Sequence, residues 1–153
     1  MTAWRDAHHG RVYDDHTLIV EALRLLLQDE FEVVGTVGGG GGLVRVAAEL
    51  QPDLVVLDIG MPMLNGLDAG EQLKQSQPKV KIIFLTQNRD PVCAAEALRR
   101  EASGYVLKSA AASELTQAIR LALLGRKYVS PAIAEQIVAR KLFSQEQPKK
   151  SSE

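Results

Sequence analysis

The sequence predicts an α/β protein whose core is a parallel β-sheet covered by helices on both faces. Apolar, β-branched runs typical of buried strands alternate five times with segments whose apolar residues recur at helical spacing. This alternation implies right-handed crossovers between parallel strands, since each helix carries the chain back to the same end of the sheet. The 153 residues and 46% apolar content are sufficient for one well-buried domain.

The most informative stretch is the strand expected at residues 54–58. Its run Leu-Val-Val-Leu fits a strand that is buried on both faces, and the strand ends on the carboxylate of Asp58. Ligands of open α/β sheets bind beyond the carboxyl ends of the strands, which places Asp58 where chemistry would occur. Pro62, Asn65 and Gly66 then interrupt regular structure. Taken alone, an Asp at this point could equally cap the next turn or helix.

The N-terminal part of the chain carries weaker signals. A short first strand is expected at residues 11–16, with Asp14 and Asp15 at its end, and the apolar spacing from Leu18 to Leu26 indicates a helix. The chain then continues with a strand at 31–37, a flexible loop of five glycines at 38–42 and an amphipathic helix at 43–50.

The elements after the central strand repeat the order of strand, polar residue and helix. The strand at 80–86 ends on the hydroxyl of Thr86, and the strand at 102–108 ends on the ammonium of Lys108. Each is followed by a helix with a start signal, Asp90-Pro91 in the first case and Ser109 in the second. The expected helices lie at 67–76, from 90 to 101, and from 109 to the terminating Gly125.

Polar side chains therefore gather at one edge of the predicted sheet, namely Asp14, Asp15, Asp58, Thr86 and Lys108. Converging carboxylates repel one another unless a cation lies among them, and hard oxygen ligands suit Mg²⁺. An ionised Asp58 could act as a nucleophile, while Lys108 and Thr86 contact the phosphoryl oxygens. These groups are the ones required for phosphoryl transfer to a carboxylate.

This set of residues resembles the motifs of response-regulator receiver domains of two-component signalling. The match covers about residues 11 to 125 and keeps the family's order and spacing: Asp14-Asp15, Asp58 with Met61-Pro62 and Asn65-Gly66 after it, Thr86, and Gly104-Tyr105 with Lys108. The resemblance implies a flavodoxin-like, doubly wound (βα)5 fold with a five-stranded parallel sheet in the order 2-1-3-4-5.

The resemblance also implies the roles of the site residues. A sensor histidine kinase would phosphorylate Asp58, and the chain would catalyse its own phosphoryl transfer and dephosphorylation without being an enzyme in the usual sense. Mg²⁺ would be bound by Asp15, Asp58 and the backbone carbonyl of Gly60, with Asp14 acting largely through water.

Two further expectations concern how such a site would work. Thr86 and Tyr105 should form a switch, in which the Thr86 hydroxyl moves toward the phosphate and the Tyr105 ring turns into the vacated space. Binding of Mg²⁺ should be weaker than the motif ordinarily implies. The strand that carries Asp14 and Asp15 has little apolar content beyond Val12 and Tyr13, so it would be poorly fixed beside the central strand.

Details of the motifs are most similar to the NarL/LuxR-type subfamily, whose members usually carry a C-terminal helix-turn-helix domain. No such domain is expected in the residues after 125, so the chain is either the receiver half of a larger regulator or a stand-alone receiver. The expected organisation is an N-terminal tail at 1–10, a receiver domain at 11–125, a linker with a short helix at 126–143 and a disordered tail at 144–153. A homodimer is expected from the subfamily. Binding to DNA, and control of transcription, would require the missing domain.

Composition excludes several other classes of protein. The net charge of −1 gives no general electrostatic affinity for nucleic acid or for an anionic membrane. Cys93 is the single cysteine, which excludes an internal disulfide and a cysteine-only metal cluster. The histidines are expected not to be metal ligands. With no signal peptide and no long apolar run, the chain is expected to be cytoplasmic.

Two other functions share part of this pattern with the receiver. A haloacid-dehalogenase-like phosphatase also uses an aspartyl-phosphate, but it needs a second Asp two positions after the nucleophile, where this chain has Gly60. A degenerate receiver would keep the fold as a phosphorylation-independent docking module. The presence of the acidic residues, Thr86 and Lys108 argues against this second alternative, while the poor first strand keeps it open.

Overall fold

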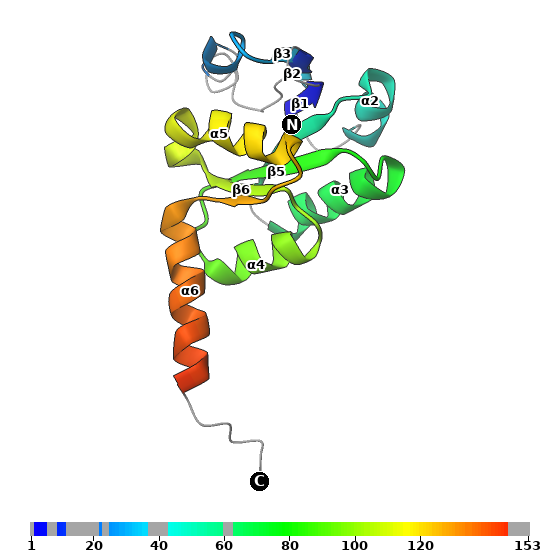
Figure 1. Ribbon diagram of the computed structural model, residues 1–153. Coiled ribbons are helices and arrows are strands. Elements are labelled where there is room, and N and C mark those ends of the chain that lie inside the picture. The colour runs from blue at the N-terminus through cyan, green and yellow to red at the C-terminus, as the bar shows by residue number, and fades with distance from the viewer. Residues whose placement is uncertain are drawn as a thin grey trace.

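The computed structural model describes residues 2–5, 9–11, 22, 25–36, 43–59 and 63–146. In these ranges, strands and helices alternate along the C-terminal two thirds of the chain (Figure 1). The strands are β1 (Thr2–Arg5), β2 (His9–Arg11), β3 (Glu32–Thr36), β4 (Leu54–Ile59), β5 (Lys81–Thr86), β6 (Gly104–Leu107) and β7 (Tyr128–Val129). The helices are α2 (Leu43–Leu50), α3 (Met63–Ser76), α4 (Pro91–Arg99), the 3₁₀ turn η1 (Lys108–Ala110), α5 (Ala111–Leu123) and α6 (Pro131–Glu146).

The sheet has the order β2-β1-β4-β5-β6-β7, and β3 pairs with β1. The four strands from β4 to β7 are parallel, and the sequence predicts this arrangement for β4, β5 and β6. Their register sets Asp58 opposite Leu85, and Thr86 opposite both Ile59 and Leu107. The carboxyl ends of β4, β5 and β6 therefore lie side by side at one edge of the sheet.

The parallel strands are buried on both faces. Alternate residues point to opposite sides of a strand. Thus Leu54, Val56, Ile83 and Leu85 join α5 in one apolar cluster, which also contains Leu27 and Phe31. The residues between them, among them Val55, Ile82, Phe84 and Tyr105, join α2, α3, α4 and the start of α6 in the other. Figure 1 shows this layering, with α5 on one side of β5 and β6, and with α3 and α4 on the other.

The N-terminal strands differ from the prediction of a five-stranded parallel sheet. β1 and β2 lie in the stretch expected as a tail, and β1 pairs antiparallel with β2, with β3 and, at the single pair Thr2↔Val56, with β4. Of the strand expected at 11–16, only Arg11 is described, and it belongs to β2. Polar residues such as His9 resist a place in the middle of a two-sided sheet, whereas short antiparallel edge strands tolerate them.

The remaining differences concern boundaries. Helix α3 begins at Met63, about one turn earlier than expected. Ser109 does not cap α5, because the 3₁₀ turn η1 comes between strand and helix and the N-cap position is held by Ala110. Strand β7 was not predicted, and α6 extends to Glu146, past the short helix expected to end at residue 143.

Other local signals are confirmed. The Asp90 side chain accepts a hydrogen bond from the backbone N–H of Val92, with Pro91 in the first turn of α4. Gly125 ends α5 with φ at +83°, a conformation that favours glycine. Within the described ranges, no helix is long and apolar enough to span a membrane.

Candidate functional site

Asp58 and Lys108 form an ion pair at the carboxyl edge of the parallel strands. Asp58 is next to last in β4, and Lys108 is the first residue after β6, which leaves the sheet through η1. The Lys108 Nζ lies 2.5 Å from the Asp58 Oδ2, and the two side chains are only 14% and 15% exposed. A carboxylate and an ammonium that are this close and this sheltered interact more strongly than an exposed surface pair. The structure therefore brings together Asp58 and Lys108. The sequence predicts the first as the nucleophile and the second as a contact of the phosphoryl oxygens.

Thr86 and Tyr105 are neighbours on the face of the sheet that α4 covers. Both are buried, with Tyr105 fully inaccessible. Burial raises the pKa of the Tyr105 hydroxyl, and a hydrogen bond with the Thr86 side chain partly opposes that shift. The ring of Tyr105 thus occupies an inward position in this structure, in contact with the residue expected to move it.

The Thr86 hydroxyl also contacts the loop that leads into α4. Its oxygen accepts a hydrogen bond from the backbone N–H of Asn88 at 2.9 Å, and the side-chain Oδ1 of Asn88 accepts one from the backbone N–H of Asp90 at 2.7 Å. Since Asp90 caps α4, a chain of hydrogen bonds runs from the end of β5 to the start of that helix. A displacement of Thr86 would therefore be transmitted to α4.

Three of the predicted metal-binding residues, Asp14, Asp15 and Gly60, lie outside the described residues. Of the predicted ligands, Asp58 alone falls within them. Across the described ranges, no three His, Cys, Asp or Glu side chains are grouped so that they could hold a metal ion. The carboxylate of Asp58, at the edge of the sheet, has the oxygen chemistry that Mg²⁺ prefers.

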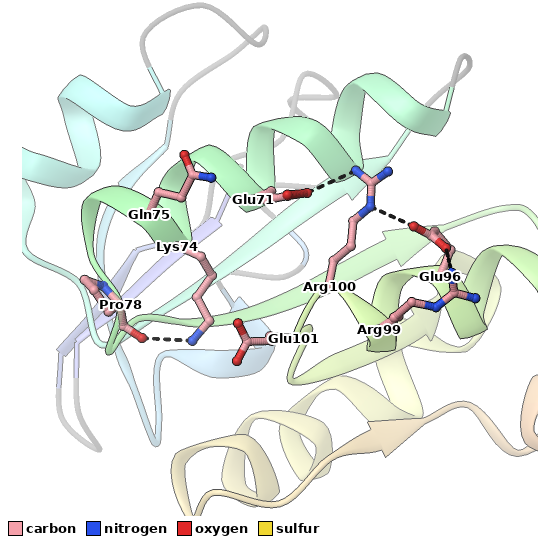
Figure 2. Close-up of a pocket in the computed structure, with 8 residues that line it drawn as sticks. All are labelled: Glu71, Lys74, Gln75, Pro78, Glu96, Arg99, Arg100 and Glu101. Atoms are coloured by element: carbon pink, nitrogen blue, oxygen red, sulfur yellow. Dashed lines mark hydrogen bonds and ion pairs between the residues drawn. The ribbon is translucent and has the colours of Figure 1, made fainter.

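A separate polar pocket of about 590 Å³ lies between α3 and α4 (Figure 2). It is lined by the C-terminal parts of these helices and by Pro78, and so lies at the edge of the sheet opposite to Asp58. Arg100 contacts Asp68, Glu71 and Glu96 there, and these contacts hold α3 to α4. Lys74 donates to the Pro78 carbonyl, and burial lowers the pKa of its ammonium group. None of the predicted site residues line this pocket.

The sequence reasoning missed a buried hydrogen-bonded group beside β6. Ser130 is fully buried, and its hydroxyl donates to the Glu114 carboxylate at 2.6 Å. Tyr128 donates to the same oxygen at 3.0 Å. The signal available in the sequence is the dipeptide Ser130-Pro131, a helix-start pattern within the segment predicted as a linker.

The arrangement as a whole presents a nucleophilic carboxylate, an ammonium and a hydroxyl at adjacent strand ends of an α/β sheet. Comparison with known families assigns this combination: the family model of the response regulator receiver domain matches residues 11–120, and the chain belongs to that family. The resemblance noted in the sequence is thereby confirmed. Receiver domains are the signalling modules that kinases phosphorylate in two-component systems.

Curated relatives are response regulators of the same type. The chain is 36% identical over 138 residues to the response regulator GacA of Pseudomonas aeruginosa, covering 89% of this chain and 64% of that protein. It is 34% identical to the response regulator UvrY of Escherichia coli, covering 90% of this chain and 62% of that protein. A third relative is the transcriptional regulatory protein DegU of Brevibacillus brevis, 31% identical over 92% of this chain and 61% of that protein. The chain thus spans less than two thirds of the length of these relatives.

Solved structures show the same fold. A LuxR-family two-component response regulator from Aurantimonas sp. superposes with a TM-score of 0.78 at 33% identity, covering 85% of this chain and 94% of that one. The isolated REC domain of RcsB from Salmonella enterica serovar Typhimurium, in the presence of the phosphomimetic BeF3⁻, superposes with a TM-score of 0.68 at 26% identity, covering 80% and 93%. These neighbours support the assignment to the NarL/LuxR-type group.

Proposed function

We propose that this chain is a phospho-accepting receiver in which Asp58 takes a phosphoryl group from a sensor histidine kinase. The observation that carries the proposal is the 2.5 Å contact between Asp58 and Lys108 at the carboxyl edge of the parallel strands. Burying a charged pair costs free energy, and charged groups of this kind cluster at functional sites. The pair therefore supports a receiver that accepts phosphate over a degenerate receiver that acts only as a docking module.

The roles of the described residues follow from their positions. A carboxylate oxygen of Asp58 attacks phosphorus, so that an O–P bond forms while the bond from phosphorus to the donor nitrogen breaks. Lys108 lies where its ammonium can neutralise a phosphoryl oxygen, and Thr86, at the end of the neighbouring strand β5, can donate a hydrogen bond to another. Attack of water on the aspartyl-phosphate later releases phosphate and restores Asp58.

A bound Mg²⁺ would neutralise the charge on the phosphoryl oxygens during this reaction. The residues proposed to hold it are Asp14, Asp15, Asp58 and the backbone carbonyl of Gly60. The oxygen donors of this set are those that Mg²⁺ prefers.

We also propose that Thr86 and Tyr105 form the switch that reports phosphorylation. Support comes from the hydrogen bond between their side chains and from the chain of contacts that joins Thr86 to the N-cap of α4. A hydroxyl drawn toward the phosphate would weaken its contacts with Asn88 and Tyr105, and the surface formed by α4 and β6 would change. The names of the relatives support a transcriptional output, and a homodimer is proposed by likeness to the subfamily.

The proposed function is tested by incubating the whole chain with acetyl phosphate and Mg²⁺ and measuring its intact mass. One labile phosphate adduct is expected in the wild-type chain and none in Asp58→Asn, since asparagine lacks the nucleophilic oxygen. Asp53→Asn is a matched control, because Asp53 lies just before the same strand but at its opposite end. An adduct that persists in Asp58→Asn would contradict the assignment of the acceptor.

A further inference from the structure

Ser130 occupies the junction between β7 and α6, and its contacts are unusual for that position. It directly precedes Pro131, the first residue of α6, and its carbonyl accepts hydrogen bonds from the Ile133 and Ala134 N–H groups. A serine at the start of a helix commonly uses its side-chain oxygen to accept from the helix's own first N–H groups. Here the Ser130 oxygen accepts a hydrogen bond from the Leu107 N–H, at 2.9 Å. The side chain of Ser130 thus bonds to the backbone of β6.

This contact completes the pairing between β6 and β7. In a parallel pair, one residue bonds to two residues on the neighbouring strand that are two positions apart. The Ser130 N–H donates to the Tyr105 carbonyl at 3.0 Å, and the Ser130 hydroxyl oxygen accepts from the Leu107 N–H. The chain turns away into α6 at Pro131, so no later residue of β7 pairs with Leu107. The Ser130 hydroxyl takes the place of a backbone carbonyl as the acceptor for the Leu107 N–H. This bond is the last rung of the hydrogen-bond ladder between β6 and β7.

The last rung of β6 bears directly on the site. Leu107 is the final residue of β6, and Lys108, whose ammonium reaches Asp58, is the next residue in the chain. The position of the Leu107 peptide therefore sets the point from which the lysine side chain starts. Glu114 holds the hydroxyl in place from α5, because its carboxylate accepts a hydrogen bond from the Ser130 hydroxyl at 2.6 Å. Both Ser130 and Leu107 are buried, so water does not readily replace these contacts.

We propose that Ser130 is a positioning residue for Lys108, held by Glu114, so that docking of the C-terminal segment against β6 supports phosphoryl transfer at Asp58. The inference rests on the proposed function of Asp58 and Lys108. It assigns a role in the reaction to a residue that is remote from the phosphoryl group and lies outside the family match of residues 11–120.

The test measures the rate of phosphorylation by acetyl phosphate with Mg²⁺ in the whole chain, at a temperature well below the unfolding midpoint of every variant. Ser130→Ala should reduce the rate about three- to tenfold, the range that corresponds to losing one buried hydrogen bond. Ser130→Thr keeps the hydroxyl and should restore the rate. Ser103→Ala is the matched control, because Ser103 is a second buried serine near β6 but precedes the opposite end of the strand.

A merely structural role predicts a different pattern. If Ser130→Ala lowers the unfolding temperature but phosphorylates at the wild-type rate, the proposal is wrong. Should Ser130→Ala fail to fold, Glu114→Ala replaces it, since removal of the acceptor leaves the hydroxyl poorly oriented. A rate reduced about twofold or more then supports the proposal, and a wild-type rate overturns it. Failure of the wild-type chain to take phosphate would instead contradict the proposed function of Asp58.

Discussion

The parallel strands β4 to β6 and the N-terminal strands β1 to β3 belong to one sheet but are held in it very differently. β4 and β5 pair along six consecutive residues, and both are buried on their two faces. β1 meets β4 at one residue pair, and its other pairings are with short antiparallel strands. The half of the site that carries Asp58, Thr86 and Lys108 is thus built on strands whose own sequences determine their place.

The difference shows that a site at the edge of a sheet depends on the strand beneath each of its residues. Continuous apolar runs produce strands that are buried on both faces, and such strands deliver their last residues to the edge in a defined register. The sequence before Asp14 and Asp15 lacks such a run. The pattern that predicts the position of Asp58 and Lys108 is therefore absent before Asp14 and Asp15.

The largest expected effect is that of Lys108→Ala on phosphorylation. Loss of one group that stabilises developing charge lowers a rate by about a hundredfold in comparable sites, and we expect a loss of that size with acetyl phosphate. Lys79→Ala, which removes an exposed lysine in the turn before β5, is the control and should leave the rate unchanged. A Lys108→Ala rate within a factor of about three of the wild type would show that the strand-end lysine does not serve the reaction.

A core substitution in β5 should cost the most stability. Ile83 is fully buried between β4 and β6, so Ile83→Ala should lower the free energy of unfolding by about 2–5 kcal/mol. Val138→Ala, in the exposed part of α6, should change it by less than about 0.5 kcal/mol. Urea unfolding followed by circular dichroism measures both. Equal losses in the two variants would remove the basis for treating β5 as the anchor of the site.

Amide hydrogen exchange should separate the two groups of strands. The amides of β5 are paired on both sides, whereas β3 pairs with β1 alone among the described strands. We expect the amides of β3 to exchange about tenfold faster or more than those of β5, because local opening costs less free energy than global unfolding. Mass spectrometry of peptic fragments reports both strands in one experiment. Equal protection would mean that the N-terminal strands are held as firmly as the parallel ones.

The smallest effect concerns alkaline pH. Burial, together with the hydrogen bond to Glu114, raises the pKa of Tyr128 from 10.0 to about 12. A raised pKa in the folded state means that the protonated hydroxyl stabilises the fold below pH 10.0, and that this stabilisation is lost as the pH rises through about 12. Between these values the wild-type chain should lose more stability than Tyr128→Phe. Parallel losses in urea unfolding would show that the hydroxyl makes no such contribution.

The parallel half of the fold could be predicted from the sequence, since apolar runs and helix-start residues such as Asp90 are local signals. The positions of Asp58 and Lys108 followed from the same signals, because the carboxyl ends of parallel strands share one edge. The antiparallel pairing of β1 could not be predicted, because it depends on which partner is available to a short strand and not on its own pattern. The contact between Ser130 and Leu107 joins residues 23 positions apart and has no local signature.

Helix α6 has a mechanical consequence. It consists of 16 residues, and the described side chains that pack against the domain core, the buried Ile133 and the partly buried Ile137, lie in its first half (Figure 1). At the helical rise of about 1.5 Å per residue it is a rod of about 24 Å. A rotation of about 10° at Ser130 would move the far end of that rod by about 4 Å, so a small change of angle where α6 begins would become a displacement on the scale of a side chain at its far end.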